Sequence, residues 1–355
     1  MTSEQLEQLL GSLVQAKIKR IKGAVIIDDT AFDNVAMSPG TTWDDKDFCW
    51  GAPVSALNIN QNCVSATLVP AARPGEPAKL ELPVYPQPIR FINRVTTQAP
   101  ATKDCVIKVK PEADKTYTIS GCIKTNAEPQ NVAMAISEPR ANARSLVTYL
   151  LKKNHIKISK KIAFGKIPSS VEVFAKQDSV PFKTLVTTML KESDNGIAES
   201  LFKTIGASYA QEPGSFTNGN EAVRAILAKS LSLDLPKTTL IDGSGVSRYT
   251  FITPQQIVTL LQKVFSSDYA AYFISSLPVS GVDGTLKDRM KEPLTQGKVH
   301  AKTGSMTAVY SLSGYLETKT KRTLIFSIMI NGFVDSPEKY KALEDKLCAV
   351  LIKSG

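Results

Sequence analysis

The first regular pattern of apolar positions lies at the amino terminus. Five apolar residues fall on one stripe of a helix over residues 2–15: Leu6, Leu9, Leu10, Leu13 and Val14. Thr2 and Gln5 have the spacing of a capping box, in which side chains satisfy the first free N–H groups of a helix. The sequence therefore predicts an amphipathic helix directly after Met1, with no secretory signal peptide before it.

Residues 56–125 follow a different pattern. Short alternating apolar runs are broken by Pro and Gly, and they read SATLV, LELPVY, CVIKVK and TYTISGCI. Alternation of this kind is typical of half-buried strands. The sequence predicts a small β-rich module here, and it shows no internal repeat.

Longer elements begin near residue 140. Five segments have helical spacing: SLVTYLLKKN, PFKTLVTTMLKES, DNGIAESLFKTIG, NEAVRAILAKSL and TPQQIVTLLQKVF. Three strands follow, KVHAKTGS, AVYSLSGYLET and TLIFSIMING, and a last helix starts at Ser336. This order predicts an α/β (α+β) fold with a central antiparallel sheet flanked by helices. We place the domain boundary between residues 140 and 141.

The helical spacing also predicts which faces are buried. In the segment PFKTLVTTMLKES, Phe182, Leu185, Val186 and Leu190 lie on one face of the helix. In the last helix the inward residues are Tyr340, Leu343, Leu347, Val350 and Leu351. In DNGIAESLFKTIG, Ser200 and Lys203 lie opposite the apolar arc, which predicts that both face solvent.

Composition and charge narrow the class of protein. The chain has 355 residues, of which 43% are hydrophobic and 21% charged, so it is globular and long enough for two domains. No apolar stretch approaches the ~20 residues of a membrane helix. The net charge is +10, but the lysines are spread along the chain without a basic helix. This spread argues against a nucleic-acid partner and leaves only a general attraction to anionic polymers.

Cysteine and histidine usage argues against a metal site. The two histidines, His155 and His300, lie far apart, and the five cysteines show no CxxC spacing. Four cysteines cluster in the first half: Cys49, Cys63, Cys105 and Cys122. Such a cluster suits disulfides in an oxidising compartment, and Cys105 with Cys122 is the favoured pair because both flank predicted strands. The alternative is that all five are reduced core residues.

Two tripeptides carry candidate chemistry. Ser193-Asp194-Asn195 lies at a helix–helix junction, and Lys302-Thr303-Gly304 lies within a predicted strand. A loop serine and asparagine can relay a proton and hold a substrate amide. Lys302, with the hydroxyls of Thr303 and Ser305, can bind a terminal carboxylate, and Gly304 leaves room for a peptide beside the strand. The alternative is a helix cap and a solvated lysine.

Together with their flanking segments, these motifs resemble one family. LKESDNGIAESLFKTIG, IDGSGVSRYTFITPQQ, SLPVSGVDGTLKDRM and VHAKTGSMTAVYSLSGYLE are similar to the D-alanyl-D-alanine carboxypeptidase/endopeptidases, the class C low-molecular-mass penicillin-binding proteins. The resemblance implies a serine β-lactamase/transpeptidase-like fold with inserted β-rich domains over residues 1–140 and part of the catalytic domain over 141–355. It also implies peptidoglycan peptides and β-lactams as ligands, no cofactor, and a periplasmic or cell-surface location.

The resemblance implies roles for single residues as well. Ser193 and Asn195 would assist proton transfer and substrate positioning, and Lys302, Thr303, Gly304 and Ser305 would form the carboxylate-binding strand. In the rest of the chain, the segment from Asp242 to Gly245 lacks the spacing of a phosphate loop, so we expect a turn. Gly281–Thr285 is likewise expected to form a structural loop, and His300 to be an ordinary strand residue.

The sequence departs from the family at the nucleophile. The family places a Ser-x-x-Lys motif near its amino terminus, and no such motif precedes Ser193 here. Two matches follow it, Ser200–Lys203 and Ser336–Lys339, the second at a predicted helix N-cap. We therefore expect no nucleophile in this chain and little activity of the chain alone. An amino-terminal truncation, a start codon placed too far downstream, a decayed copy and a non-catalytic peptidoglycan-binding homologue all fit this expectation.

Overall fold

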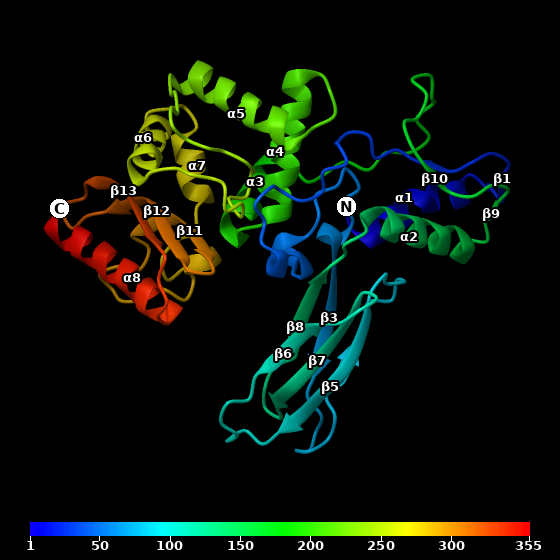
Figure 1. Ribbon diagram of the computed structural model, residues 1–355, viewed down its shortest axis with the longest axis horizontal. Coiled ribbons are helices and arrows are strands. Elements are labelled where there is room, and N and C mark those ends of the chain that lie inside the picture. Colours follow the sequence, from blue (N-terminus) through cyan, green and yellow to red (C-terminus); the bar gives the residue numbers. More distant parts are fainter. The chain divides into compact units, whose positions relative to one another are not determined.

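The computed structural model describes residues 1–355, which form two compact units (Figure 1). Unit 1 comprises Met1–Met37 and Thr41–Asp178, and unit 2 comprises Ser38–Gly40 and Ser179–Gly355. The last passage of the chain from unit 1 to unit 2 lies at residues 178–179, whereas the sequence predicts a domain boundary at 140–141. The reason is that helix α2 (Pro139–Lys153) packs with α1 (Ser3–Gln15) in one apolar core of unit 1.

Helix α1 begins as the sequence predicts. The Gln5 N–H donates to Thr2 Oγ1 at 3.2 Å, and the Thr2 N–H donates to Gln5 Oε1 at 2.8 Å, which completes the capping box. Leu6 is buried in the core that α1 shares with α2, where it joins Leu146 and Leu150. Burial of these leucines fixes the two helices side by side.

The two helices of unit 1 end in the same way. Lys17 after α1 and His155 after α2 both have left-handed backbone, with φ of 59° and 57°. In both cases the next residue is an isoleucine that donates its N–H back to the helix. After each of these isoleucines the chain enters a short strand. Strand β1 (Arg20–Ile21) pairs in parallel with β9 (Lys157–Ile158), and β2 (Ile26–Ile27) pairs in parallel with β10 (Ala163–Phe164). The structure thus repeats a helix–strand–strand pattern that the sequence does not show as a repeat.

Two three-stranded sheets form the β-rich part of unit 1. One has the order β4 (Lys79–Glu81), β3 (Cys63–Val69), β8 (Gln130–Ala135), and all its pairs are antiparallel. The other has the order β5 (Arg90–Gln98), β7 (Thr116–Lys124), β6 (Ile107–Pro111), with β5 and β7 parallel. Short 3-10 turns at Trp43–Asp47, Cys49–Gly51 and Asn60–Asn62 precede them.

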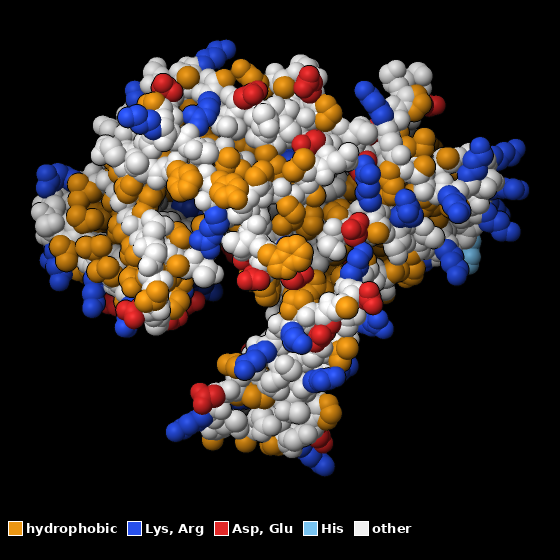
Figure 2. All heavy atoms as spheres, viewed as in Figure 1, with side chains coloured by type: hydrophobic (Ala, Val, Ile, Leu, Met, Phe, Trp, Pro, Cys, Tyr) orange, Lys and Arg blue, Asp and Glu red, His pale blue; other side chains and the backbone are white.

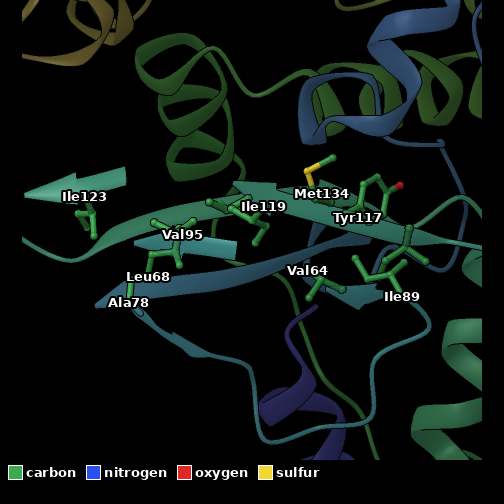
Figure 3. Close-up of a cluster of buried hydrophobic side chains, with 11 residues drawn as sticks. Val64, Leu68, Ala78, Ile89, Val95, Tyr117, Ile119, Ile123 and Met134 are labelled. Carbon is green, nitrogen blue, oxygen red and sulfur yellow. The ribbon is translucent and has the colours of Figure 1, made fainter. Parts of the chain in front are cut away.

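The two sheets share one apolar core, drawn in Figure 3. Leu68, Ile119 and Ile123 are almost completely buried there. This confirms the predicted β-rich module. Strand β5 was not among the predicted runs, because its inward positions include Asn93 and Thr97 and so break the apolar alternation.

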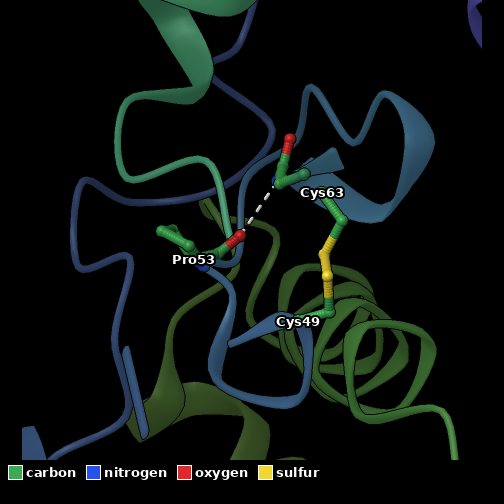
Figure 4. Close-up of a disulfide and its surroundings, with 4 residues drawn as sticks. Cys49, Pro53 and Cys63 are labelled. Carbon is green, nitrogen blue, oxygen red and sulfur yellow. Dashed lines mark hydrogen bonds between the residues drawn. A yellow bond between two sulfur atoms is a disulfide. The ribbon is translucent and has the colours of Figure 1, made fainter. Parts of the chain in front are cut away.

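The four clustered cysteines form two disulfides within unit 1. Cys105 bonds to Cys122 with a Cα–Cα distance of 5.2 Å, which confirms the favoured pair. Cys49 bonds to Cys63 with a Cα–Cα distance of 5.7 Å (Figure 4). Close to this second bond, Asn62 Nδ2 donates to the Pro53 carbonyl at 2.9 Å. The fifth cysteine, Cys348, is free and buried in unit 2.

Unit 2 is built on the predicted antiparallel sheet. Its order is β11 (Val299–Met306), β12 (Val309–Glu317), β13 (Thr323–Asn331). Helix α8 (Pro337–Ser354) shares an apolar core with one face, and α6 (Pro254–Phe265) and α7 (Ala270–Ser276) share another core with Tyr315. Val299 and Tyr315, at neighbouring positions of the sheet, belong to these two different cores. Helices therefore cover both faces, as predicted.

Helices α3 (Phe182–Glu192), α4 (Asn195–Ala210) and α5 (Phe216–Leu231) precede the sheet. The axes of α4 and α5 approach closely where Gly206 meets Gly219, since a methyl group at either position would overlap the opposite helix. This contact buries Lys203 completely, and its Nζ lies 4.4 Å from the centre of the Phe216 ring. The prediction that Lys203 faces solvent was wrong, because α5 covers the side of α4 that the apolar arc left open.

The predicted inward face of α8 was also wrong. Helix α8 buries Glu344, Cys348 and Ile352, whereas Leu343 and Val350 are 44% and 59% exposed. Arg289 explains this rotation, because its guanidinium bonds Glu344 and Asp345 and so draws that side of α8 inward. In α3, Phe182 is 67% exposed and no residue of the helix is fully buried.

Candidate active site

The structure brings Ser193 and Lys302 into contact. Ser193 ends helix α3 with left-handed backbone (φ 57°), and Lys302 lies in the middle of β11. Lys302 Nζ donates to Ser193 Oγ at 2.6 Å and to the Thr303 carbonyl at 2.8 Å. The two tripeptides that the sequence singles out therefore meet through one lysine–serine hydrogen bond within unit 2.

The surroundings of Lys302 change its acidity. Burial lowers the pKa of Lys302 from its ordinary value to about 8, because a buried ammonium group loses hydration. At neutral pH the group is still mainly an ammonium ion and can bind an anion. A pKa this close to neutrality also lets it exchange a proton with the bonded Ser193 hydroxyl.

The other two residues of the first tripeptide start helix α4. Asp194 is its N-cap, with Oδ1 accepting the Ile197 N–H at 2.8 Å. The Asp194 N–H donates to the Met189 carbonyl at 3.1 Å and so ties the turn to the end of α3. Asp194 therefore shapes the turn that presents Ser193, and Asn195 follows it as the half-buried first residue of α4.

Strand alternation separates the side chains of the second tripeptide. Lys302 and Gly304 lie on one sheet face, and Thr303 and Ser305 lie on the other. The Thr303 hydroxyl shares a 2.8 Å hydrogen bond with the Thr285 hydroxyl. A methyl group at Gly304 would overlap the Ser311 hydroxyl. This glycine therefore also makes room for the neighbouring strand β12, in addition to its predicted role of leaving room for a peptide. Joint carboxylate binding by Lys302, Thr303 and Ser305 stays a prediction.

The outer edge of β11 is open next to Lys302. At its start, the Ala301 N–H donates to the Pro278 carbonyl at 3.0 Å, and the Val299 carbonyl accepts the Ser280 N–H at 3.0 Å. These groups point away from β12, and by strand alternation the peptide groups of Thr303 and Ser305 point the same way. Beyond the single antiparallel bridge of Val279 with His300, no strand pairs with β11 on that side. An extended peptide can therefore bond to this edge as an added strand.

An ion pair holds the end of α3 near β11. Lys191 Nζ bonds both carboxylate oxygens of Asp283, at 2.6 and 2.8 Å, and Asp283 also accepts the Val279 N–H at 2.9 Å. Gly284 has φ of 56° and packs so closely on the Lys191 carbonyl that a methyl group there would lie 2.7 Å from the oxygen. The expected structural loop at Gly281–Thr285 is thus a brace for Ser193. Nothing in the sequence linked Lys191 to Asp283.

A buried carboxylate fixes the start of α4. Glu199 accepts the N–H groups of Gly243 and Ser244 at 3.0 and 3.2 Å. Burial, and then the charge of Asp242, raise the pKa of Glu199. Asp242 in turn accepts the Ser247 N–H at 2.7 Å, which confirms that this segment forms a turn.

The two later Ser-x-x-Lys matches sit in other surroundings. The carbonyl of Ser200 accepts the Thr204 hydroxyl at 2.7 Å, while Lys203 is buried over Phe216. Ser336 is the N-cap position of α8, as predicted, but its hydroxyl donates to the Glu338 carboxylate and accepts no backbone N–H of the helix. Lys339 pairs with Asp335 at 3.5 Å.

A cavity of about 470 Å³ lies beside the same sheet but away from the Ser193–Lys302 contact. His300, Tyr315, Phe265 and Ile274 contribute to its lining, and neither Ser193 nor Lys302 does. Burial lowers the pKa of His300, and its Nδ1 has no hydrogen-bond partner. No group of three His, Cys, Asp or Glu side chains is placed to hold a metal ion. None of the helices combines the length and the apolar content of a membrane span.

Comparison with known proteins agrees with the motifs. The sequence matches the D-Ala-D-Ala carboxypeptidase 3 (S13) family over residues 1–353. It is 30% identical to the D-alanyl-D-alanine carboxypeptidase DacB of Haemophilus influenzae, covering 94% of this chain and 70% of that protein. It is also 30% identical to the D-alanyl-D-alanine carboxypeptidase of Actinomadura sp., covering 94% of this chain and 64% of that protein. The chain thus spans less than two thirds of the length of the second relative.

Solved structures agree with the fold. The crystal structure of penicillin binding protein 4 (dacB) from Haemophilus influenzae matches with a TM-score of 0.81 and 29% identity, covering 99% of this chain and 80% of that one. The same protein complexed with a novel β-lactam matches with a TM-score of 0.74 and 28% identity, covering 99% and 79%. The predicted penicillin-binding fold is confirmed. The chain belongs to the D-Ala-D-Ala carboxypeptidase 3 (S13) family.

Proposed function

We propose that the Ser193–Lys302 junction binds the terminal D-Ala-D-Ala of peptidoglycan stem peptides and cross-links, and the β-lactams that mimic it. The single observation that carries this proposal is the Lys302 ammonium group, 2.6 Å from Ser193 Oγ and beside the open edge of β11. A terminal carboxylate would bond to Lys302, and the peptide backbone would bond to the β11 edge. The names of the relatives, D-alanyl-D-alanine carboxypeptidases, support this ligand class.

The junction supplies part of the chemistry of a serine-type carboxypeptidase or endopeptidase. Acyl transfer needs a proton to move from the attacking hydroxyl to the departing amine. Ser193, bonded to Lys302, would relay that proton, and Asn195 would position the substrate amide. The attacking serine is not among these residues, because no Ser-x-x-Lys motif precedes Ser193. Loss of the nucleophile costs roughly 10⁶ in kcat in a serine hydrolase, so this chain alone would bind without turnover.

A second candidate function is a non-catalytic peptidoglycan-binding protein. The absent Ser-x-x-Lys favours it, whereas the intact Ser193–Lys302 contact favours the enzyme. For either function we infer a periplasmic or cell-surface location. The two disulfides of unit 1 support it, because such bonds persist in oxidising compartments.

Two measurements on the full chain test the proposal. Intact-mass spectrometry after incubation with a penicillin should show no adduct, because no activated serine is expected. Calorimetry should detect binding of a peptide ending in D-Ala-D-Ala and no binding of the same peptide with its carboxylate amidated. An adduct of the drug's mass would overturn the prediction of a missing nucleophile. Equal binding of the acid and the amide would overturn the role of Lys302.

A further inference from the structure

Folding gathers cations that the sequence keeps apart. Lys17, Lys19, Arg20 and Lys22 follow α1, and Lys152, Lys157, Lys160 and Lys161 follow or end α2. The parallel pairing of β1 with β9 sets these two segments side by side, with Arg20 directly opposite Lys157. We call these eight residues the basic end of unit 1. Figure 2 shows blue side chains crowded over the part of unit 1 where Figure 1 labels β1 and β9. The expectation of evenly spread charge was therefore wrong.

The basic end has no neutralising carboxylates. All eight side chains are exposed, and none forms an ion pair. The sequence contains no Asp or Glu between Glu7 and Asp28, or between Glu138 and Glu172. The nearest ion pair joins Glu7 to the neighbouring Lys153, which is not one of the eight. The fold thus presents a surface of one sign at this end of unit 1.

Fold stability alone does not account for this arrangement. Cations near the last turn of a helix are favourable, which explains Lys17 and Lys152. Arg20 and Lys157, however, face each other across two paired strands, where like charges repel. Lys160 and Lys161 lie beyond the end of β9. A ligand with several negative charges would relieve this repulsion.

The composition of the basic end indicates which anionic partner it fits. Residues 17–22 and 152–161 contain no Phe, Tyr or Trp, so apart from the His155 imidazole the surface offers no ring on which nucleic-acid bases could stack. The disulfides of the same unit favour a compartment outside the cytosol. Outside the cytosol, a surface that carries many phosphates is the head-group layer of a membrane rich in anionic phospholipid. Exposed basic clusters bind such layers through long-range attraction that salt screens.

We propose that the basic end of unit 1 docks this protein onto anionic phospholipid membranes. The proposal is independent of peptide binding at Ser193 and Lys302, because those residues belong to unit 2. Docking of this kind is electrostatic and reversible, since the basic end offers no aromatic anchor for the membrane interface.

Vesicle sedimentation of the full, oxidised chain tests the proposal. Vesicles of phosphatidylcholine with about one third phosphatidylglycerol should bind the chain at low salt, and pure phosphatidylcholine vesicles should not. The test variant replaces four lysines of the basic end by glutamine: Lys19, Lys22, Lys157 and Lys160. The matched control replaces four exposed lysines of unit 2 by glutamine: Lys229, Lys263, Lys319 and Lys346. Both variants remove four charges from the net +10.

The two variants should differ sharply. We expect the partition coefficient to fall at least about tenfold for the basic-end variant and less than about twofold for the control, since each nearby cation contributes about fivefold. A third variant with arginine at the same four positions should bind like the parent chain. Circular dichroism melts of all variants report whether unit 1 remains folded.

Several outcomes would overturn the proposal. Equal losses in the test and control variants would make the attraction a property of net charge. No binding to the anionic vesicles at low salt would remove the membrane as a partner. Tighter binding to a sulfated polysaccharide or to duplex DNA than to the vesicles, at the same ionic strength, would reassign the basic end to a polymer.

Discussion

Unit 1 and unit 2 use lysine in opposite ways. In unit 2, Lys302 is half-buried against Ser193, and the loss of hydration there lowers its pKa to about 8. In unit 1 eight cations stand exposed on paired segments, without a carboxylate partner. Bringing distant segments together thus creates a chemically tuned group in one unit and a field of charge in the other. The first depends on ångström-scale geometry, and the second depends on the number of charges and on ionic strength.

The units also differ in how they are held together. Both disulfides lie in unit 1, while unit 2 contains only the free, buried Cys348. Unit 2 relies on noncovalent contacts, including the Lys191–Asp283 pair that braces Ser193. The contrast leads to experiments that perturb one unit and leave the other unchanged.

The largest expected effect is on the stability of unit 1. Replacing Cys105 and Cys122 by serine should lower its free energy of unfolding by about 3 kcal/mol, the value typical of a loop of this length. Differential scanning calorimetry should show the transition of unit 1 shifting down and that of unit 2 unchanged. A Cys348→Ala variant serves as the control. Because Cys348 forms no disulfide, adding a reductant should lower the unfolding transition of unit 1 as much in this variant as in the parent chain. Equal shifts of both transitions would show that the units unfold together.

The next effect concerns Lys302. Lys302→Met should weaken binding of a D-Ala-D-Ala peptide by about 10- to 100-fold, because a charge-assisted hydrogen bond contributes about 1.5–3 kcal/mol. Isothermal titration calorimetry provides the measurement, and Lys319→Met, an exposed lysine of the same unit, is the matched control. Unchanged affinity in Lys302→Met would show that Lys302 does not bind the peptide carboxylate.

The acidity of Lys302 gives a pH dependence. With its pKa at about 8, the ammonium form falls about tenfold between pH 7 and pH 9, and peptide affinity should fall with it. The lowered pKa of Lys302 also makes the stability of the fold depend on pH, but stability rises with pH where peptide affinity falls. The unfolded lysine keeps its proton up to its ordinary pKa, so this group makes the fold more stable as pH rises above 8. Affinity measured from pH 6 to 9.5 tests the first point, and a flat profile in Lys302→Met is required.

The smallest effect concerns the brace. Lys191→Met should weaken peptide binding about three- to tenfold by loosening the turn at Ser193, and Asp283→Asn should do the same. The double variant should lose no more than either single one, since both remove one interaction. Lys191→Arg should recover most of the affinity. Lys183→Met, an exposed change on the same helix, should have no effect, and a loss there would point to general damage of α3.

Local signals made much of the fold predictable. The capping box at Thr2 and the strands around Lys302 depend on neighbours in sequence, and both predictions were confirmed. The buried faces of α4 and α8 were not predictable, because they depend on distant partners. Lys203 is buried by α5, and Glu344 is drawn inward by Arg289.

The candidate site was predictable in parts only. Family motifs pointed to Ser193 and Lys302, which the fold then places 2.6 Å apart. The Lys191–Asp283 brace and the basic end were missed, since each joins segments far apart in the chain. A like-charge pair such as Arg20 and Lys157 is not what a sequence pattern would suggest as strand partners.

The pairing of β3 with β8 has a consequence for how this chain can be rebuilt. Cys63, where the chain enters the β-rich part, is the direct strand partner of Ala135, where it leaves, and the Ile136 N–H donates to the Asn62 carbonyl at 2.7 Å. Segments whose ends lie this close behave as insertions that a host fold tolerates losing or exchanging. The β-rich part is therefore a natural cassette for protein engineering. A short turn joining these two ends would keep the parallel strand pairs of unit 1, whereas the α1–α2 core would lose Tyr85, whose hydroxyl donates to Glu7 at 2.7 Å.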